Sequence, residues 1–256
     1  MQAHERITAA IKAANDAGRT ALVPFITAGH PEPKDFIATL TAVASAGDVV
    51  ELGIPFSDPM ADGMTIQRSS FEALQKGVSL AWIFDQLDKA GPIEAPLVMM
   101  SYLNPLLAFG YEQLAERALA TGVCGFIVPD LPFEESEDIR EALARHGLGL
   151  IQLVTPATPD ERLKVLCEES RGFVYAVTIT GITGGDVGLP ADLAGYLDKV
   201  AAISKLPVCA GFGIRAASDV ANVGRHAAGA IVGSALVEVI ERGENAAGFL
   251  DGLREQ

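Results

Sequence analysis

The regular alternation of strand-like and helix-like segments is the feature that most restricts how this chain can fold. Short β-branched runs recur eight times, and longer amphipathic, Ala/Leu-rich runs separate them. This pattern is typical of repeated βα units around a parallel sheet. Eight units within 256 residues favour closure into a (β/α)8 barrel, the TIM barrel, over an open doubly wound sheet.

The pattern places each element on the chain. We expect strands at Ala21–Thr27, Asp48–Gly53, Leu97–Tyr102, Gly125–Val128, Gly149–Val154, Phe173–Thr178, Val208–Phe212 and Ala230–Gly233. We expect helices at Lys34–Ala46, Leu80–Ala90, Tyr111–Thr121, Ser136–His146, Asp160–Glu169, Ala191–Ser204, Ala217–Gly224 and Ala235–Arg254. An additional helical segment, His4–Ala17, should cap the bottom of the barrel. No long linker divides the chain, so residues 1–256 are predicted to form one domain.

Composition restricts the class of protein and its expected location. The chain is 49% apolar, yet no apolar run approaches the roughly 20 residues that cross a bilayer. Its first residues lack the apolar core of a secretory signal, so a cytoplasmic location is expected. The three cysteines, Cys124, Cys167 and Cys209, form no CxxC pair, and each is expected to be a small buried residue rather than a disulfide or zinc ligand.

The charge balance opposes a general attraction to nucleic acids or anionic lipids. The net charge is −14, from 19 basic and 33 acidic residues. An anionic substrate would therefore need local stabilisation. Backbone N–H groups at helix N-termini can supply it without lysine, so a phosphate site is still compatible with this sequence.

Glu51 is the most unusual residue in the predicted strands. Alternation along its strand puts it on the same face as Val49, with Val50 and Leu52 on the other face. Both faces of a barrel strand are buried, and an unpaired ionised glutamate there would cost several kcal/mol. Burial should raise its pKa and suit it to carry a proton, although a buried ion pair is the structural alternative.

The segment after this strand contains two further acids. Residues 54–63 hold two prolines, which restrict the backbone, together with Asp58 and Asp62. A loop aspartate is usually a solvated or capping group, so neither would be assigned to catalysis by itself. In a barrel, however, loops at the C-terminal ends of the strands form the active site.

The segment Glu51–Gly63, ELGIPFSDPMADG, resembles the signature of the tryptophan synthase alpha subunit family almost residue for residue. Five other segments share the resemblance in the same order: Val23–Gly29, Met100–Pro105, Val128–Pro132, Gly181–Gly184 and Gly211–Ile214. The match is long, specific and spread over most of the chain.

The resemblance implies a reaction: retro-aldol cleavage of indole-3-glycerol phosphate to indole and glyceraldehyde 3-phosphate, in tryptophan biosynthesis. Glu51 matches the glutamate that transfers protons at the indole ring and the side-chain hydroxyl. Asp62 matches the aspartate that stabilises charge at the indole N–H. Protonation of indole C3 makes the ring nitrogen cationic, which gives a nearby carboxylate a physical role.

The resemblance also implies how substrate is held. The phosphate would be bound by the backbone at Gly184, Gly213, Gly233 and Ser234. The indole pocket would be formed by seven residues, although packing in the barrel core is the alternative for the apolar ones: Phe25, Met100, Tyr102, Ile127, Tyr175, Thr183 and Phe212. Thr183 would contact Asp62 when the glycine-rich loop after the sixth strand closes. No metal is expected.

The family further implies a partner, a beta subunit that contains pyridoxal phosphate and receives indole within an α2β2 complex. No cofactor is expected in this chain itself, and the Asp58-Pro59 loop should lie at the subunit contact. Two departures affect loops rather than the two acids. Met64 replaces a common proline, and 178–180 replace a stretch that often contains serine and arginine.

Three alternatives stay open at this point. The chain could be another phosphate-binding barrel enzyme, such as an isomerase. It could be a stand-alone lyase that exports free indole. It could also be a non-catalytic barrel that only regulates a partner, although the presence of both Glu51 and Asp62 argues against that.

Overall fold

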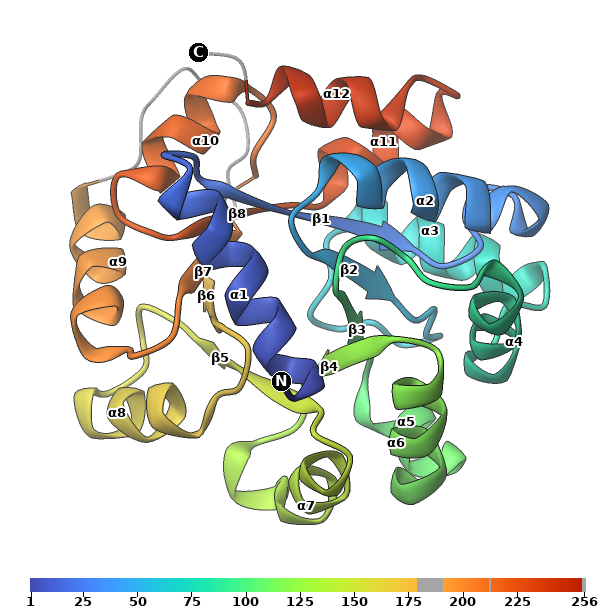
Figure 1. Cartoon of the computed structure of the whole chain (residues 1–256), viewed down its shortest axis with the longest axis horizontal. Coiled ribbons are helices and arrows are strands. Elements are labelled where there is room, and N and C mark those ends of the chain that lie inside the picture. Colours follow the sequence, from blue (N-terminus) through green and yellow to red (C-terminus); the bar gives the residue numbers. More distant parts are fainter. Residues whose placement is uncertain (179–190, 212, 255–256) are drawn as a thin grey trace.

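Eight parallel strands close into a barrel in which each strand pairs with its sequence neighbours and β8 returns to β1 (Figure 1). The structure is a computed structural model, and it describes residues 1–178, 191–211 and 213–254. The strands are β1 (Ala21–Thr27), β2 (Val50–Gly53), β3 (Leu97–Met100), β4 (Val123–Ile127), β5 (Gly149–Val154), β6 (Val174–Val177), β7 (Val208–Gly211) and β8 (Gly229–Val232). The predicted TIM barrel is confirmed.

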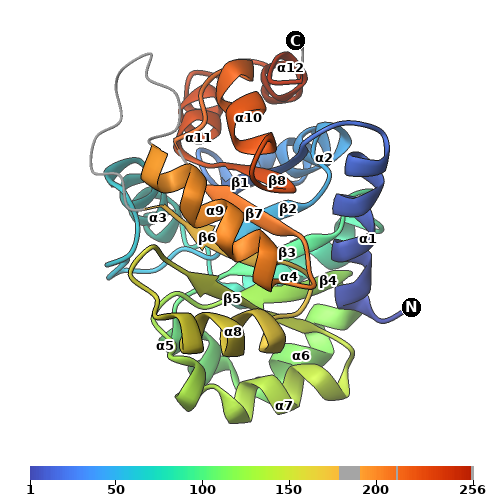
Figure 2. The same cartoon turned by 90° about the vertical axis from the view of Figure 1, so that its left-hand side faces the viewer.

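Helices surround the barrel, as the two orthogonal views show (Figures 1 and 2). They are α1 (Ala3–Asp16), α2 (Phe36–Ala46), α3 (Met64–Gln75), α4 (Leu80–Ala90), α5 (Leu103–Phe109), α6 (Tyr111–Ala120), α7 (Glu137–Arg145), α8 (Asp160–Glu169), α9 (Ala191–Ile203), α10 (Ala217–Gly224), α11 (Ser234–Glu241) and α12 (Ala246–Gly252). Two short 3-10 turns, Pro33–Asp35 and Phe133–Glu135, precede α2 and α7. Among the described helices, none is long and apolar enough to cross a membrane.

The core has two layers. Outward-facing strand residues pack against the surrounding helices in one large cluster. Inward-facing residues form a second cluster inside the barrel, and α1 contributes Ile7, Ile11 and Ala14 to it. The hydroxyl of Thr8 donates to the carbonyl of Gly172 at 2.6 Å, which fastens α1 to the segment before β6. The N-terminal helix therefore closes the bottom of the barrel, as predicted.

Some helix predictions need correction. The sequence did not indicate α3 or α5, which lie in the connections after β2 and β3. The predicted helix Ala235–Arg254 is in fact two helices, because Gly243 adopts a φ of +69° that ends α11. The Asn245 side chain then accepts a 3.0 Å bond from the N–H of Gly248 and starts α12.

Two strand starts differ from the prediction by two residues, and two others by one residue. The predicted strand at Asp48 begins instead at Val50, because the carboxylate of Asp48 accepts bonds from the N–H of Leu22 (2.8 Å) and from Arg254 (2.9 Å). β4 starts at Val123 rather than Gly125, with a register shift against β3 that keeps Cys124 inside the barrel. Cys167 and Cys209 are also buried, and all three thiols are free.

Candidate active site

Glu51 points into the barrel from β2. Its neighbour on the same face, Val49, belongs to the inner cluster, whereas Val50 and Leu52 belong to the outer one. The Glu51 side chain is only 1% exposed, and its backbone lies level with Phe25 on β1. Period-two alternation had predicted this orientation, and closure of the barrel accounts for the burial.

The carboxyl group of Glu51 favours its protonated form. Burial, and secondarily the negative charge of Asp62, raise its pKa to about 8. Its Oε2 atom has no hydrogen-bond partner within the described protein. Among the described residues, none offsets the cost of ionisation, so the group holds a proton at neutral pH.

Asp62 reaches the same region from the connection between β2 and α3. Its N–H donates to the carbonyl of Pro59 at 3.1 Å, and the side-chain amide of Gln67 donates to the Asp62 carbonyl at 2.8 Å. Burial raises the pKa of its carboxyl to about 6, against the lowering effect of a hydrogen bond with Tyr102. At neutral pH the site therefore pairs a protonated Glu51 with an ionised Asp62.

Tyr102 holds this connection in place. Its hydroxyl accepts a 2.9 Å bond from the N–H of Ala61, and its ring stacks on Phe56 with centroids 5.0 Å apart. The ring is buried at 3% exposure, directly before α5. The resemblance placed Tyr102 in the pocket, but Phe56 was missed, because one aromatic residue in a loop gives no periodic signal.

The predicted apolar pocket residues line the same interior. Ile127 lies in the inner cluster, and Met100 and Tyr175 pack against it. The Phe25 ring fits because residue 53 is glycine, whose Cβ would lie 2.4 Å from Phe25 Cζ. Burial, and then the charges of Glu51 and Asp62, keep the pKa of Tyr175 well above its ordinary value, so its hydroxyl stays neutral beside the two acids. Thr183 and Phe212 lie outside the described residues.

The predicted phosphate positions lie at two neighbouring strand ends. Gly213 follows β7 with a φ of +62°, a conformation that favours glycine. Gly233 follows β8, and Ser234 is the first residue of α11. The first N–H groups of a helix have no acceptors within it and can bind an anion. Gly184 lies outside the described residues.

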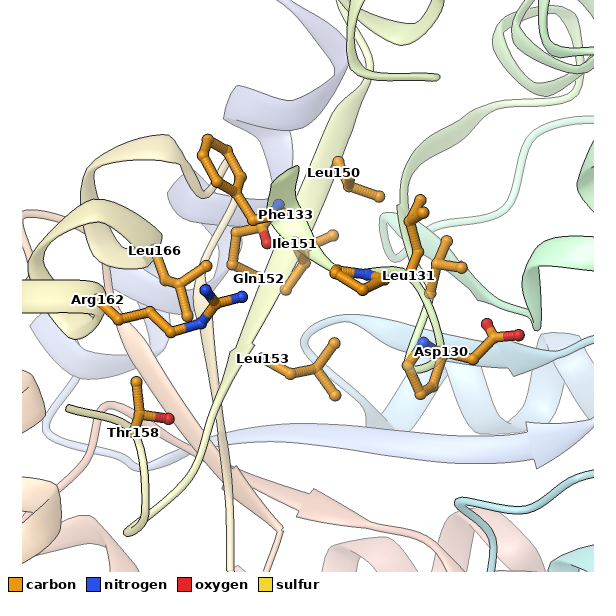
Figure 3. Close-up of a pocket in the computed structure, with 13 residues that line it drawn as sticks. Asp130, Leu131, Phe133, Leu150, Ile151, Gln152, Leu153, Thr158, Arg162 and Leu166 are labelled. Atoms are coloured by element: carbon orange, nitrogen blue, oxygen red, sulfur yellow. The ribbon is translucent and has the colours of Figure 1, made fainter. Parts of the chain in front are cut away.

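Two other features contain none of the predicted site residues. A groove of about 290 Å³ opens between the segment after β4, strand β5 and α8, and Figure 3 shows Gln152 and Arg162 on its wall. Its lining includes neither Glu51 nor Asp62. The described residues also contain one group with the spacing of metal ligands, which lies on α6 and at the end of α7: Glu112, Glu116 and His146. Glu112 there already accepts bonds from Arg145 and His146.

Known proteins match this chain over nearly its whole length. The family model described as tryptophan synthase alpha chain matches residues 11–253. A tryptophan synthase alpha chain from Solidesulfovibrio magneticus is 44% identical over 95% of this chain and 96% of its own. One from Roseiflexus sp. is 45% identical over 93% and 94%.

Solved structures agree with the sequence relatives. The tryptophan synthase subunit alpha of Legionella pneumophila superposes with a TM-score of 0.88 at 32% identity, covering 99% of this chain and 97% of that one. A ligand-free tryptophan synthase from M. tuberculosis gives a TM-score of 0.87 at 32% identity, with 97% of both chains covered. On this agreement of sequence, barrel and site, the chain belongs to the tryptophan synthase alpha chain family.

Proposed function

We propose that this barrel cleaves indole-3-glycerol phosphate to indole and glyceraldehyde 3-phosphate, with Glu51 and Asp62 as its catalytic residues. The observation that carries this proposal is a glutamic acid buried inside the barrel, with a pKa of about 8, beside an aspartate whose pKa is about 6. Two acids whose environments separate their pKa values can act as a proton donor and a fixed negative charge.

The chemistry follows from these protonation states. Protonated Glu51 donates to C3 of the indole ring, and the ring nitrogen becomes cationic. Ionised Asp62 accepts the indole N–H and stabilises that charge. The Glu51 carboxylate then takes the proton of the C3′ hydroxyl while the bond between C3 and C3′ breaks, so that an aldehyde and indole form. Glu51 ends protonated, which restores its starting form.

The substrate phosphate would bind across the ends of β7 and β8. Gly213 lets the backbone approach an anion closely, and α11 begins at Ser234, where the first N–H groups of a helix lack acceptors within it. This arrangement needs no cation, which agrees with a chain of net charge −14. The phosphate would thus lie at one side of the barrel mouth and the indole near Phe25 and Ile127.

A partner would bind at the mouth of the barrel beside α3 and α5. Met60 and Met64 are 82% and 78% exposed, and Leu107 on α5 is 58% exposed. The bond from Ala61 to Tyr102 brings the two segments together. We assign this surface, with the Asp58-Pro59 loop, to a beta subunit of an α2β2 complex. The steps above are assigned to Glu51 and Asp62, so we assign pyridoxal phosphate to that partner. We also propose that the chain works in the cytoplasm.

The test of this function is release of indole from indole-3-glycerol phosphate, measured with and without a tryptophan synthase beta subunit. We expect slow release by the chain alone and a marked increase on addition of the partner. Equal rates in both arms would favour a stand-alone lyase. No indole in either arm, from a folded protein, would contradict the proposed activity and favour a non-catalytic barrel or another phosphate-binding enzyme.

The pH dependence of kcat/KM is a second prediction, because it reports the free enzyme. Activity needs Glu51 protonated, so it should fall as pH rises through about 8. Activity also needs Asp62 ionised, so it should fall as pH drops through about 6. Indole release measured from pH 5 to 9 should give a bell with its maximum between these values. A profile that keeps rising above pH 8 would contradict the role of Glu51 as the acid.

A further inference from the structure

A line of polar side chains joins α3 to α11, which pack directly against each other. Arg68 of α3 donates to the carboxylate of Glu241 at 2.6 Å, and the hydroxyl of Thr65 lies 3.4 Å from Glu238. Thr65 and Arg68 are one helical turn apart, as are Glu238 and Glu241, so the two helices meet in register. We call these four residues the α3–α11 seam.

Further contacts tie the seam to the barrel. His30, which follows β1 and is 6% exposed, lies 3.0 Å from Glu241 through its Nε2 atom. Arg215, two residues after Gly213, donates to both carboxylate oxygens of Glu238 at 3.0 and 3.2 Å. The seam thus connects the segments that follow β1, β2, β7 and β8, all at the same end of the barrel.

The two helices of the seam begin at opposite ends of the proposed substrate. α3 begins two residues after Asp62, and Gln67 of α3 holds the Asp62 carbonyl at 2.8 Å. α11 begins at Ser234, where the phosphate would bind. A shift of one helix against the other would therefore change the distance between the indole contact and the phosphate contact. A small error in such spacing is costly, because both ends of one molecule must bind together.

We propose that Glu241 and Arg68 are positioning residues that set the distance between Asp62 and the phosphate-binding end of α11. This inference rests on the proposed function, since it assumes a substrate held at both ends. Neither residue touches the reacting atoms, and each acts through the helix that carries it. The Arg68 side chain in this ion pair is half exposed, and such pairs add little to stability, so the main effect of the pair is expected on the substrate rather than on folding.

The experiment compares indole-3-glycerol phosphate, which would contact both Asp62 and the phosphate site, with glycerol 3-phosphate and indole, which would each contact only one of them. Glu241→Ala removes the bonds to Arg68 and His30, and we expect kcat/KM for indole-3-glycerol phosphate to fall about tenfold. Equilibrium binding of glycerol 3-phosphate alone, and of indole alone, should change by less than about twofold, because each occupies one side only. Loss of affinity for both single ligands by the same factor would overturn the proposal and indicate a general structural role.

Two further variants keep the test decisive. Arg68→Ala removes the ion pair from a side chain that is half exposed and leaves the His30 contact with Glu241 in place, so it should fold normally and show a smaller loss of the same kind. Glu244→Ala is the matched control, because Glu244 pairs with Arg242 in the exposed turn after α11. If both seam variants match this control in kcat/KM, the proposal fails. Wild-type protein that releases no indole would contradict the proposed function instead, and binding of glycerol 3-phosphate would still test the phosphate site.

Discussion

Glu51→Gln is expected to lower indole release by at least about a thousandfold, since general acid–base catalysis by one group contributes about 10²–10⁴-fold and Glu51 would serve two proton transfers. Glutamine keeps the size of the side chain but can neither donate a proton to indole C3 nor accept one from the C3′ hydroxyl. Indole release under single-turnover conditions measures the effect. Near-normal turnover would exclude Glu51 as the proton carrier.

The free energy of unfolding provides a control measurement for Glu51→Gln. Wild-type Glu51 has a pKa near 8 in the folded protein and about 4.5 when exposed, so the folded state favours its protonated form. That contribution is complete below pH 4.5 and is lost as pH rises through 8. Between these two pKa values, wild type loses about 1.4 kcal/mol of unfolding free energy for each pH unit, whereas the variant does not. At pH 7, Glu51→Gln should therefore exceed wild type in free energy of unfolding by about 3 kcal/mol. Urea unfolding should show equal stability near pH 4.

Asp62→Asn is expected to slow cleavage by about 10²–10³-fold, the usual cost of removing one preorganised electrostatic contact to a charged transition state. The amide can still contact Tyr102, so the connection between β2 and α3 should keep its shape. The measurement is kcat for indole release together with the pH profile of kcat/KM. The fall in activity below about pH 6 should disappear, because the group that titrates there has been removed.

Measurements of folding and ligand binding decide how a loss of activity in Asp62→Asn is interpreted. Circular dichroism should match the wild type, and glycerol 3-phosphate should bind with unchanged affinity, because the proposed phosphate contacts at Gly213, Gly233 and Ser234 do not include Asp62. An unfolded variant would leave its activity uninformative, and Asp62→Glu would then replace it. A folded Asp62→Asn protein with wild-type kcat would contradict the assigned role.

Sequence patterns predicted the architecture because they record local burial. The β-branched runs gave all eight strands, and alternation placed Glu51 inside the barrel. Predictions were weaker where tertiary contacts override local preference. The chain around Asp48 leaves the strand to bond Leu22 and Arg254, and Gly243 divides the last predicted helix. Helices α3 and α5 were not predicted, because one helix was expected in each connection and these two connections hold a second one.

The sequence by itself determined the barrel, the burial of Glu51 and, through the signature that begins there, the family. Those features depend on the order and spacing of residues close together along the chain, which can be read directly from the sequence. The tertiary structure decided the rest. Tyr102 and Phe56 approach across separate loops, Asp62 reaches a pKa between its ordinary value and that of Glu51, and Glu241 meets Arg68 across 173 positions. Contacts so distant in sequence form only when the barrel closes, since closure brings the ends of all its strands to one face.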